Sequence, residues 1–249
     1  MSFDTLLLLS FPTMLFAGMV LELLVRSPRP QPAIRYWRLI GIAGFVATLI
    51  VNILSPLVIL PLFPATGPLD LSGWSWWGAV PTVVLTTFFT YWSHRIQHRY
   101  DLLWRLGHQL HHGVARIDAA SAFIFHPIDV FVQVFWSLVA ALLLGVTPQA
   151  AGVAGAAGFL IALYQHLDVP TPVWTGWFFQ RPEAHMLHHQ RDIHSRNFGD
   201  MPVWDMLFGT YANPRRADVP VGFEPDRSRR VLAMLACVDV NAASGRERH

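Results

Sequence analysis

The sequence predicts an all-α protein, an integral membrane helical bundle with a histidine-rich helical cap at one end. Of its 249 residues, 53% are hydrophobic and only 14% are charged, whereas soluble domains carry about 25% charged residues. Several uncharged stretches approach the roughly 20 apolar residues that a membrane-spanning helix needs. The chain also contains 12 histidines, and most of them recur at helical spacing.

The first three membrane spans are expected at 5–21, 39–62 and 74–93. The first two stretches are uncharged and strongly apolar. The third has aromatic residues at both ends, as is common at the two membrane interfaces. The first stretch is not expected to be a signal peptide, because Asp4 stands where such a peptide carries its basic residues.

A helical hairpin is expected after these spans. Residues 130–165 include no charged side chain, but the stretch is too long for one span. The segment GVTPQ at 145–149 contains the Gly and Pro that interrupt helices. The predicted arms are therefore 130–144 and 150–165, each rather short for a complete crossing.

The placement of arginine predicts the orientation in the membrane, because basic residues favour the cytoplasmic side. With the N-terminus outside, every arginine and every histidine group falls on the cytoplasmic side, together with the C-terminus. We expect a multi-pass protein of a bacterial inner membrane. The arginines before the hairpin are Arg26, Arg29, Arg35, Arg38, Arg95, Arg99, Arg105 and Arg116, and the others lie at or beyond Arg181.

The whole chain, 1–249, is expected to be a single membrane domain with a more polar tail at 213–249. A short helix in this tail would lie on the membrane surface or in solvent. Cys237 is the only cysteine, which excludes an intrachain disulfide and a cysteine-based zinc site. No basic tract resembles a nucleic-acid footprint, so no nucleic-acid partner is expected.

The histidines form groups in which imidazoles share one side of a helix. Spacings of three and four residues place side chains on the same face. Such a face suits neither a lipid environment nor an apolar core, and it is well suited to converge on a metal. The grouped histidines are His94 and His98 in HRIQH, His108, His111 and His112 in HQLHH, the separate His166, and His185, His188 and His189 in HMLHH.

Nine grouped histidines exceed the four ligands of one structural zinc site, so two metals are expected. Imidazole accepts Zn, Cu, Fe or Ni, and the residue types alone leave the metal open. Carboxylates would balance the charge or receive the second ring N–H of a ligand. The candidates are Asp118, Asp129, Asp168, Asp192 and Asp205. For each single Asp, and for His126, His194 and His249, an ordinary polar contact is the alternative.

In the order HRIQH, HQLHH, His166 and HMLHH, the sequence resembles the fatty acid hydroxylase/sterol desaturase superfamily of membrane-bound, histidine-box, non-haem di-iron oxidoreductases. FIFHPIDVF at 123–131 is similar to the stretch after the second box of sterol desaturase-type members. NFGDMPVWDMLFGTY at 197–211 is similar to the stretch after the last box. The resemblance covers 87–211, which is the expected catalytic core.

The resemblance implies that the nine grouped histidines bind two iron ions, with no catalytic residue beyond these ligands. Dioxygen would be the co-substrate. Some members carry a further histidine one turn before the isolated one, where this chain has Ala162. One metal would then be completed by His126, His194, an Asp or water. The residues considered for additional or supporting roles are His126, His194, Asp118, Asp129, Asn197 and Asp205.

By this resemblance the protein is expected to hydroxylate a C–H bond of a fatty acyl or sterol-like membrane lipid. Electrons would come from a separate ferredoxin, cytochrome b5 or reductase. Desaturation by the same di-iron site is the alternative within the class. Outside it, the histidines could serve a non-catalytic metal-binding or transport protein, or a zinc hydrolase. The aromatics of 174–179 would line the lipid channel or anchor the protein at the interface.

Overall fold

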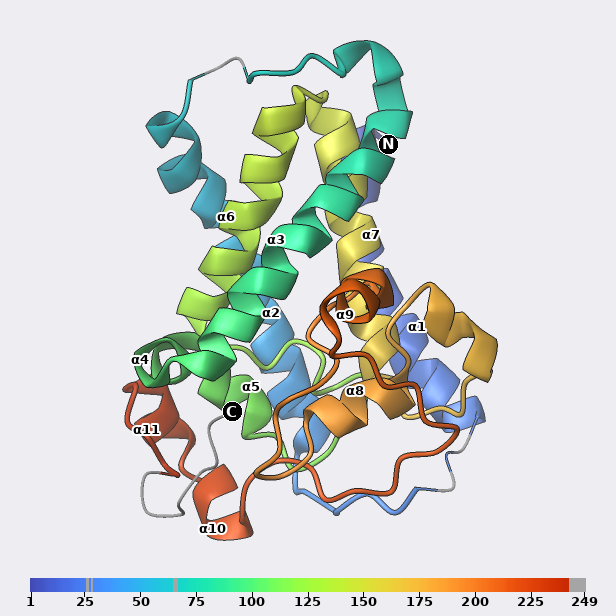
Figure 1. The fold of residues 1–249 in the computed structure, drawn as a ribbon, viewed down its shortest axis with the longest axis vertical. Coiled ribbons are helices and arrows are strands. Elements are labelled where there is room, and N and C mark those ends of the chain that lie inside the picture. Colours follow the sequence, from blue (N-terminus) through green and yellow to red (C-terminus); the bar gives the residue numbers. More distant parts are fainter. Residues whose placement is uncertain (26, 28, 65–66, 242–249) are drawn as a thin grey trace.

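The computed structural model describes residues 1–249 except 26, 28, 65–66 and 242–249. The described residues form helices and loops, with one isolated bridge between Gln190 and Val221 and no strand. This confirms the predicted all-α class. The long helices, which form the upper bundle in Figure 1, are α1 (Phe3–Leu24), α2 (Trp37–Ile59), α3 (Ala79–Arg99), α6 (Pro127–Leu144) and α7 (Pro148–His166).

Short helices cover the two ends of this bundle. Two of them, η1 (Leu60–Leu62) and η2 (Ser72–Gly78), belong to the connection between α2 and α3. The others build a cap around the lower end in Figure 1. They are α4 (Asp101–Leu103), the π-helical η3 (Trp104–His108), α5 (Gln109–His112), η4 (Val173–Trp177), α8 (Pro182–His188), α9 (Pro202–Phe208), α10 (Pro225–Ser228) and α11 (Val231–Leu235).

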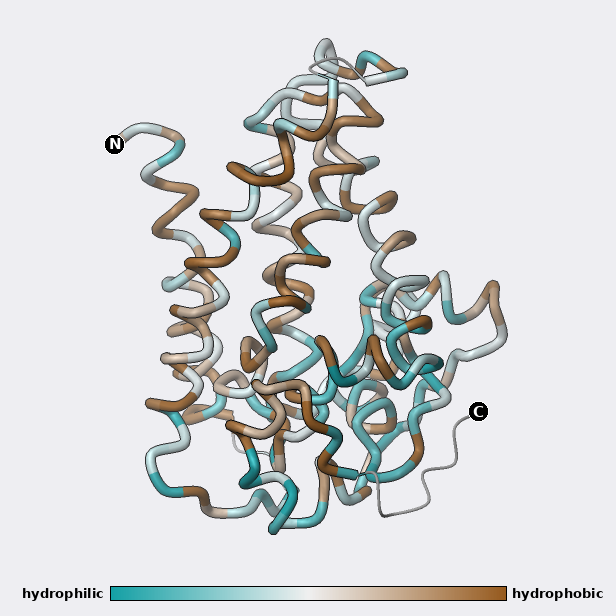
Figure 2. The backbone as a smooth tube through the Cα atoms, turned by 90° about the vertical axis from the view of Figure 1, so that its left-hand side faces the viewer, coloured by the Kyte–Doolittle hydropathy of each residue, from teal (hydrophilic) through white to brown (hydrophobic). Residues whose placement is uncertain are grey.

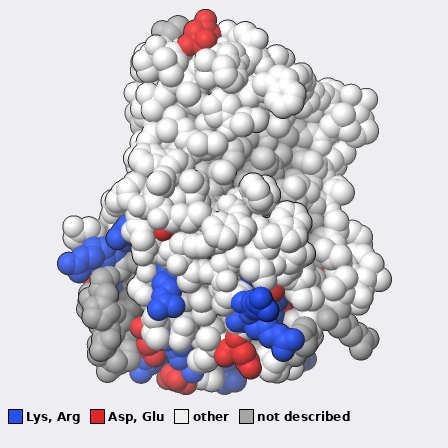
Figure 3. All heavy atoms as spheres, turned by 45° about the vertical axis from the view of Figure 1, so that its right-hand side comes forward, with Lys and Arg blue, Asp and Glu red and all other residues white. Residues whose placement is uncertain are grey.

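Within the described part of the chain, three helical segments are long and apolar enough to cross a membrane: Phe3–Leu24, Trp37–Leu62 and Pro127–Leu144. Hydrophilic segments gather in the lower half of the molecule, which holds the cap (Figure 2). On the face drawn in Figure 3, charged side chains lie in the lower part, apart from one acidic group at the top. The apolar bundle and the polar cap are thus separate regions, as the composition predicts.

The helix boundaries agree with the predicted spans except in the third. Residue 74 is the wrong start, because Ser75 has a left-handed φ of 51° that interrupts the helix. The long helix α3 begins at Ala79 and continues to Arg99. The predicted hairpin is present as α6 and α7, which are joined at Gly145 with a φ of 60°. Neither α3 nor α7 is among the three helices with sufficient length and hydropathy to span.

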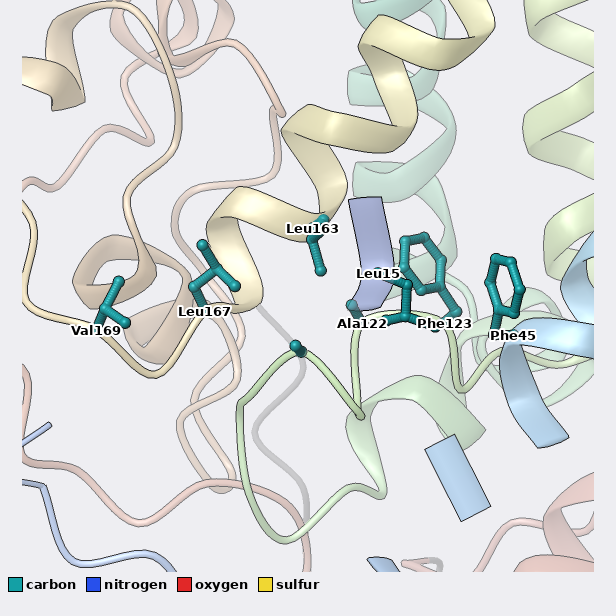
Figure 4. Packing of buried hydrophobic residues seen from close by; sticks show 8 residues of the cluster. Leu15, Phe45, Ala122, Phe123, Leu163, Leu167 and Val169 are labelled. Carbon is teal, nitrogen blue, oxygen red and sulfur yellow. The ribbon is translucent and has the colours of Figure 1, made fainter. Parts of the chain in front are cut away.

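The bundle is packed through a core between α1, α2, α7 and the loop that precedes α6. Phe45 of α2 contacts Phe123, which stacks on Phe159 with ring centroids 4.1 Å apart. Figure 4 shows this cluster, with Leu163 and Leu167 pointing into it from the end of α7. Gly41 allows α2 to approach this loop, since a Cβ there would overlap the carbonyl of Ala120. The core therefore fixes the position of α7 relative to the loop that follows residue 112.

The described part of the predicted tail, 213–241, packs against the cap. Phe223, Met234 and Val240 are buried together with Trp104 and Leu110. The short helix α11 turns Met234 inward, while Leu232 is 82% exposed. Residues 242–249, including His249, lie outside the described residues.

Candidate metal centre

The lower end of α3 supplies the first two histidines. His94 and His98 lie one helical turn apart, and their Nε2 atoms are 3.1 Å from each other. The Nδ1–H of His94 donates to the carbonyl of Phe198 at 2.7 Å. That hydrogen bond directs the other ring nitrogen toward His98.

The second box sends its histidines in two directions. His108 ends the π-helical η3, and His111 and His112 lie in α5. The Nε2 atoms of His108 and His112 are 3.1 Å apart, whereas Nε2 of His111 lies 3.3 Å from that of His166. A residue pair spaced by four thus shares one centre, and the histidine between them faces another.

The third box also divides between the two centres, but its outer pair joins His111 and its middle histidine joins His112. In α8 and its C-cap, His185 and His189 place their Nε2 atoms 3.0 Å apart. His188 instead reaches His112, with 3.0 Å between their Nε2 atoms. His166 at the end of α7 completes the second cluster, 3.1 Å from His185 through the same atoms.

The nine histidines consequently form two groups, within each of which the candidate ligand atoms lie within 4.8 Å of one another. The five-histidine group consists of His94, His98, His108, His112 and His188, and the four-histidine group of His111, His166, His185 and His189. The groups adjoin, since the rings of His112 and His189 stack with centroids 4.2 Å apart. Helices distant in sequence therefore build one double site.

The hydrogen bonds around the rings fit a bound cation. His166 donates Nδ1–H to Ala162 O at 2.7 Å, and His185 donates to Gln180 Oε1 at 2.8 Å. Both acceptors lack a proton, so in the neutral rings the Nε2 atoms carry lone pairs. Those two lone pairs face each other at 3.1 Å. Their repulsion is relieved when both nitrogens bind one metal ion.

Burial keeps these rings neutral. It holds the pKa values of His112, His188 and His189 well below the ordinary value of 6.5, and neighbouring histidines lower them further. Neutral imidazole is the form that binds metals. All members of the four-histidine group are buried, whereas His94 and His98 of the other group are partly exposed.

Among the described residues, a carboxylate accepts a ring N–H from one member of the five-histidine group. Asp129, in the first turn of α6, accepts Nδ1–H of His108 at 2.9 Å and the amide of Gln97 at 2.9 Å. Gly107 lies against Asp129, where a Cβ would come within 3.4 Å of the Asp129 Cβ. Asp129, one of the five candidate carboxylates, is thus bonded to one grouped histidine.

Two other predicted residues act on the loop that follows the third box. Asp205 accepts the backbone N–H groups of Phe198 and Gly199, both at 2.8 Å. Asn197 bonds the backbone of Ala184 and Ala212. These bonds hold the Phe198 carbonyl against His94, so both residues support the site through the backbone rather than by contacting the centre.

The structure leaves three of the proposed additional ligands outside both groups. His126 uses both ring nitrogens elsewhere: Nδ1 accepts from Ile128 N–H at the start of α6, and Nε2 is 3.2 Å from Leu235 O. Asp118 instead binds Trp37 and Arg116. His194 lies beside the five-histidine group, with its ring centroid 4.6 Å from that of His112.

Three polar residues that matter here do not figure among the predicted site residues. Gln180 orients His185, and Gln97 supports Asp129. The fully buried Arg181 binds Glu183, Thr171 and Asn213, and so anchors the start of α8. Of these three, Gln97 could have been noticed in the sequence, since it lies between His94 and His98 in HRIQH.

The chain is similar in sequence to known proteins. The profile of the fatty acid hydroxylase family matches residues 79–210. Ornithine lipid hydroxylase OlsE of Rhizobium tropici is 31% identical over 62% of this chain and 48% of its own length. Alkylglycerol monooxygenase of Xenopus tropicalis is 27% identical over 61% and 33%, respectively. A Delta(7)-sterol 5(6)-desaturase of Gibberella zeae is 27% identical over 59% and 46%.

The chain spans about half or less of the length of these curated relatives. No solved structure matches it. The family match runs from α3 to the end of the α9 segment and includes every member of both histidine groups. It covers more than half of the 249 residues, and the chain belongs to the fatty acid hydroxylase family.

Proposed function

We propose that the protein is a membrane-bound oxidoreductase that uses two irons and dioxygen to hydroxylate a C–H bond of a membrane lipid. The observation that carries this proposal is the double site, in which nine imidazoles face two adjoining centres at one end of an apolar bundle. The ornithine lipid hydroxylase and the alkylglycerol monooxygenase among its relatives, by their names, support a lipid substrate.

Two irons in such a site would supply dioxygen activation and oxidation of an unactivated C–H bond. The balanced reaction takes a lipid C–H, dioxygen, two electrons and two protons to a lipid alcohol and water. The electrons would come from a separate donor of the ferredoxin, cytochrome b5 or reductase class.

The residues of the chain would bind, orient and shield. The Nε2 atoms bind metal, and acceptors such as Ala162 O, Gln180 and Asp129 hold the rings in the required tautomer. Burial of the four-histidine group excludes bulk water, which protects a strongly oxidising site from side reactions.

The position of the site suits a substrate dissolved in the bilayer. The long helices expose apolar side chains, and the histidines lie where these helices meet the cap. The arginine distribution supports a cytoplasmic cap with the N-terminus outside, and the expected membrane is the bacterial inner membrane. The lipid would enter between the long helices and meet the site at their lower end.

Desaturation is the alternative within the family, because one named relative is a sterol desaturase. It uses the same inputs and yields a double bond with two waters. A metal transporter is less favoured, since transport sites use ionisable residues inside spans, while the histidine groups lie at the helix ends and in the cap. A zinc hydrolase would need neither dioxygen nor electrons.

The test is expression under ¹⁸O₂ followed by mass spectrometry of total lipids. Hydroxylation predicts a lipid that gains one ¹⁸O atom, and desaturation predicts a lipid that loses two hydrogens without label. His188→Ala serves as the inactive control, and Arg229→Gln serves as an active one because Arg229 is exposed and belongs to neither histidine group. Iron analysis of the purified protein accompanies the assay. An unchanged lipid profile with zinc in place of iron would overturn the proposal.

A further inference from the structure

A cavity outside the metal centre opens beside the first turn of α2. Its volume is about 370 Å³, and it is lined by Ile34, Tyr36, Trp37, Arg38, Leu39 and Arg116. Two arginines and two aromatic side chains thus meet at the lower end of a helix that is long and apolar enough to span a membrane. The family match begins at residue 79, so α2 lies outside it.

The cavity has an excess of positive charge. Arg38 is exposed and makes no hydrogen bond or ion pair within the described part of the chain. Arg35, next to the cavity, contacts Tyr36 through the ring face and the hydroxyl. Arg116 is paired with Asp118, the one carboxylate among the described residues that forms an ion pair with a lining arginine. The two arginines that line the cavity thus carry more positive charge than the single pairing with Asp118 offsets, which favours an anionic ligand.

The backbone adds to this preference. The α2 helix starts at Trp37, and its N-cap residue Tyr36 provides no side-chain hydrogen bond to the first turn. The first N–H groups of a helix carry partial positive charge and point along its axis. They reinforce the field of Arg38 at the same place.

An exposed apolar stripe on α2 begins at this cavity and leads away from it. Leu39 lines the cavity and is 63% exposed. The exposed residues that follow at spacings of three or four are Ile42, Val46, Ile50, Ile53 and Leu57. Residues with this spacing lie on one face of a helix. A cationic cavity at the end of an apolar stripe matches the shape of a lipid, with a headgroup below and acyl chains above.

We propose that this cavity binds the headgroup of an anionic phospholipid. Arg38 and Arg116 bind the phosphate, Tyr36 and Trp37 lie at the level of the headgroup, and the acyl chains follow the stripe on α2. The apolar stripe favours a lipid over a free phosphate. This site is separate from both histidine groups, and the proposal does not rest on the reaction that they support.

Binding there would steady the loop between the second histidine box and α6. Trp37 donates its indole N–H to Asp118 at 2.9 Å and packs on a core that contains Ile117 and Met186. Met186 lies between His185 and His188 in α8. A headgroup held by Arg116 and Trp37 would therefore couple the membrane surface to the frame of the metal centre.

The test measures phospholipid binding to the purified full chain in detergent, with native mass spectrometry as the readout. Phosphatidylglycerol is compared with phosphatidylcholine, and Arg38→Gln is compared with Arg229→Gln, which removes the same charge from an exposed position outside the cavity. We expect preferential retention of phosphatidylglycerol. We expect Arg38→Gln to weaken it about fivefold, the usual contribution of one basic side chain near an anionic lipid surface.

Three outcomes would overturn the proposal. The first is equal retention of the two phospholipids, and the second is an equal effect of Arg38→Gln and Arg229→Gln. The third is displacement of phosphatidylglycerol by inorganic phosphate at millimolar concentration, which would indicate a free-anion site. None of these readouts depends on turnover, so failure here is distinct from failure of the proposed hydroxylation.

Discussion

The two histidine groups share α5 and α8 but differ in what surrounds them. The five-histidine group takes two residues from α3, has partly exposed members, and has the carboxylate of Asp129 behind His108. The four-histidine group takes one residue from α7 and is wholly buried. Three of its rings, those of His111, His166 and His185, donate Nδ1–H to neutral acceptors. One scaffold therefore offers two candidate metal sites that differ in charge, in exposure and in the number of histidines.

The comparison explains why the HxxHH pattern occurs twice. Each box gives its first and last histidine to one group and its middle histidine to the other, and the two boxes do so in opposite sense. The remaining histidines of the two groups come from α3 and α7. The helix α3 supplies His94 and His98, one turn apart, and α7 supplies His166 alone. Ala162 occupies the position of the second member of that pair. Because Ala162 has no imidazole, the group that includes His166 contains four histidines and the other contains five.

Removing one ligand from each group is expected to have the largest effect. His188→Ala and His185→Ala should both abolish oxidation of lipid. The loss of metal should be more complete for His185→Ala, because three imidazoles remain in its group and four in the other. Metal analysis of both purified variants measures this difference. Retention of both metals by either variant would remove that histidine from the ligand set.

Asp129→Asn is expected to weaken metal binding in the five-histidine group by roughly 10- to 100-fold, the usual effect of losing an orienting partner of a ligand. The asparagine loses the negative charge, and its NH₂ opposes the Nδ1–H of His108 when its oxygen keeps Gln97. Gln180→Ala removes a neutral acceptor behind His185 and should act on the other group. Competition with a chelator measures both. Equal effects would mean that the carboxylate contributes no more than the amide.

His126→Ala should leave the metal content unchanged, since both ring nitrogens of His126 serve backbone groups. The expected cost is about 1 kcal/mol of stability, as for other lost N-cap bonds. Thermal unfolding in detergent measures this cost, and metal analysis provides the control. A drop in metal content without a drop in stability would return His126 to the ligand set.

Asp200→Asn is expected to have the smallest effect, and only on pH dependence. Asp200 accepts the Gln165 amide beside the four-histidine group, and burial raises its pKa above the usual 3.8. The folded chain therefore keeps this proton to higher pH than the unfolded chain. The contribution of Asp200 to stability thus falls as the pH rises from 3.8, the usual pKa, through the higher pKa of the folded chain.

The Asn variant does not ionise at this position, so its melting temperature relative to that of the wild type should rise as the pH increases above 3.8. Melting curves at several pH values test this. Parallel pH profiles for the two proteins would show that Asp200 ionises normally.

Much of the site could be predicted because several of its histidines are spaced by four residues, which places them on the same side of a helix. The pairs His94–His98, His108–His112 and His185–His189 each converge within one helical turn. The division of each box between two centres could not be predicted. Helical spacing places all three histidines on one side, and only the position of neighbouring helices decides which centre each ring faces.

The sequence by itself determined the apolar bundle, the hairpin and which nine histidines come together, because hydropathy and helical periodicity act over a few turns. Tertiary structure decided the start of α3, where Ser75 interrupts the helix, and the partners behind the rings. Gln97 and the carbonyl of Phe198 are separated from their partners by long stretches of sequence. Gln180 lies just before α8, and its contact with His185 depends on the path of the loop that enters this helix. Such contacts depend on how loops close in space, and no local pattern of residues encodes that closure.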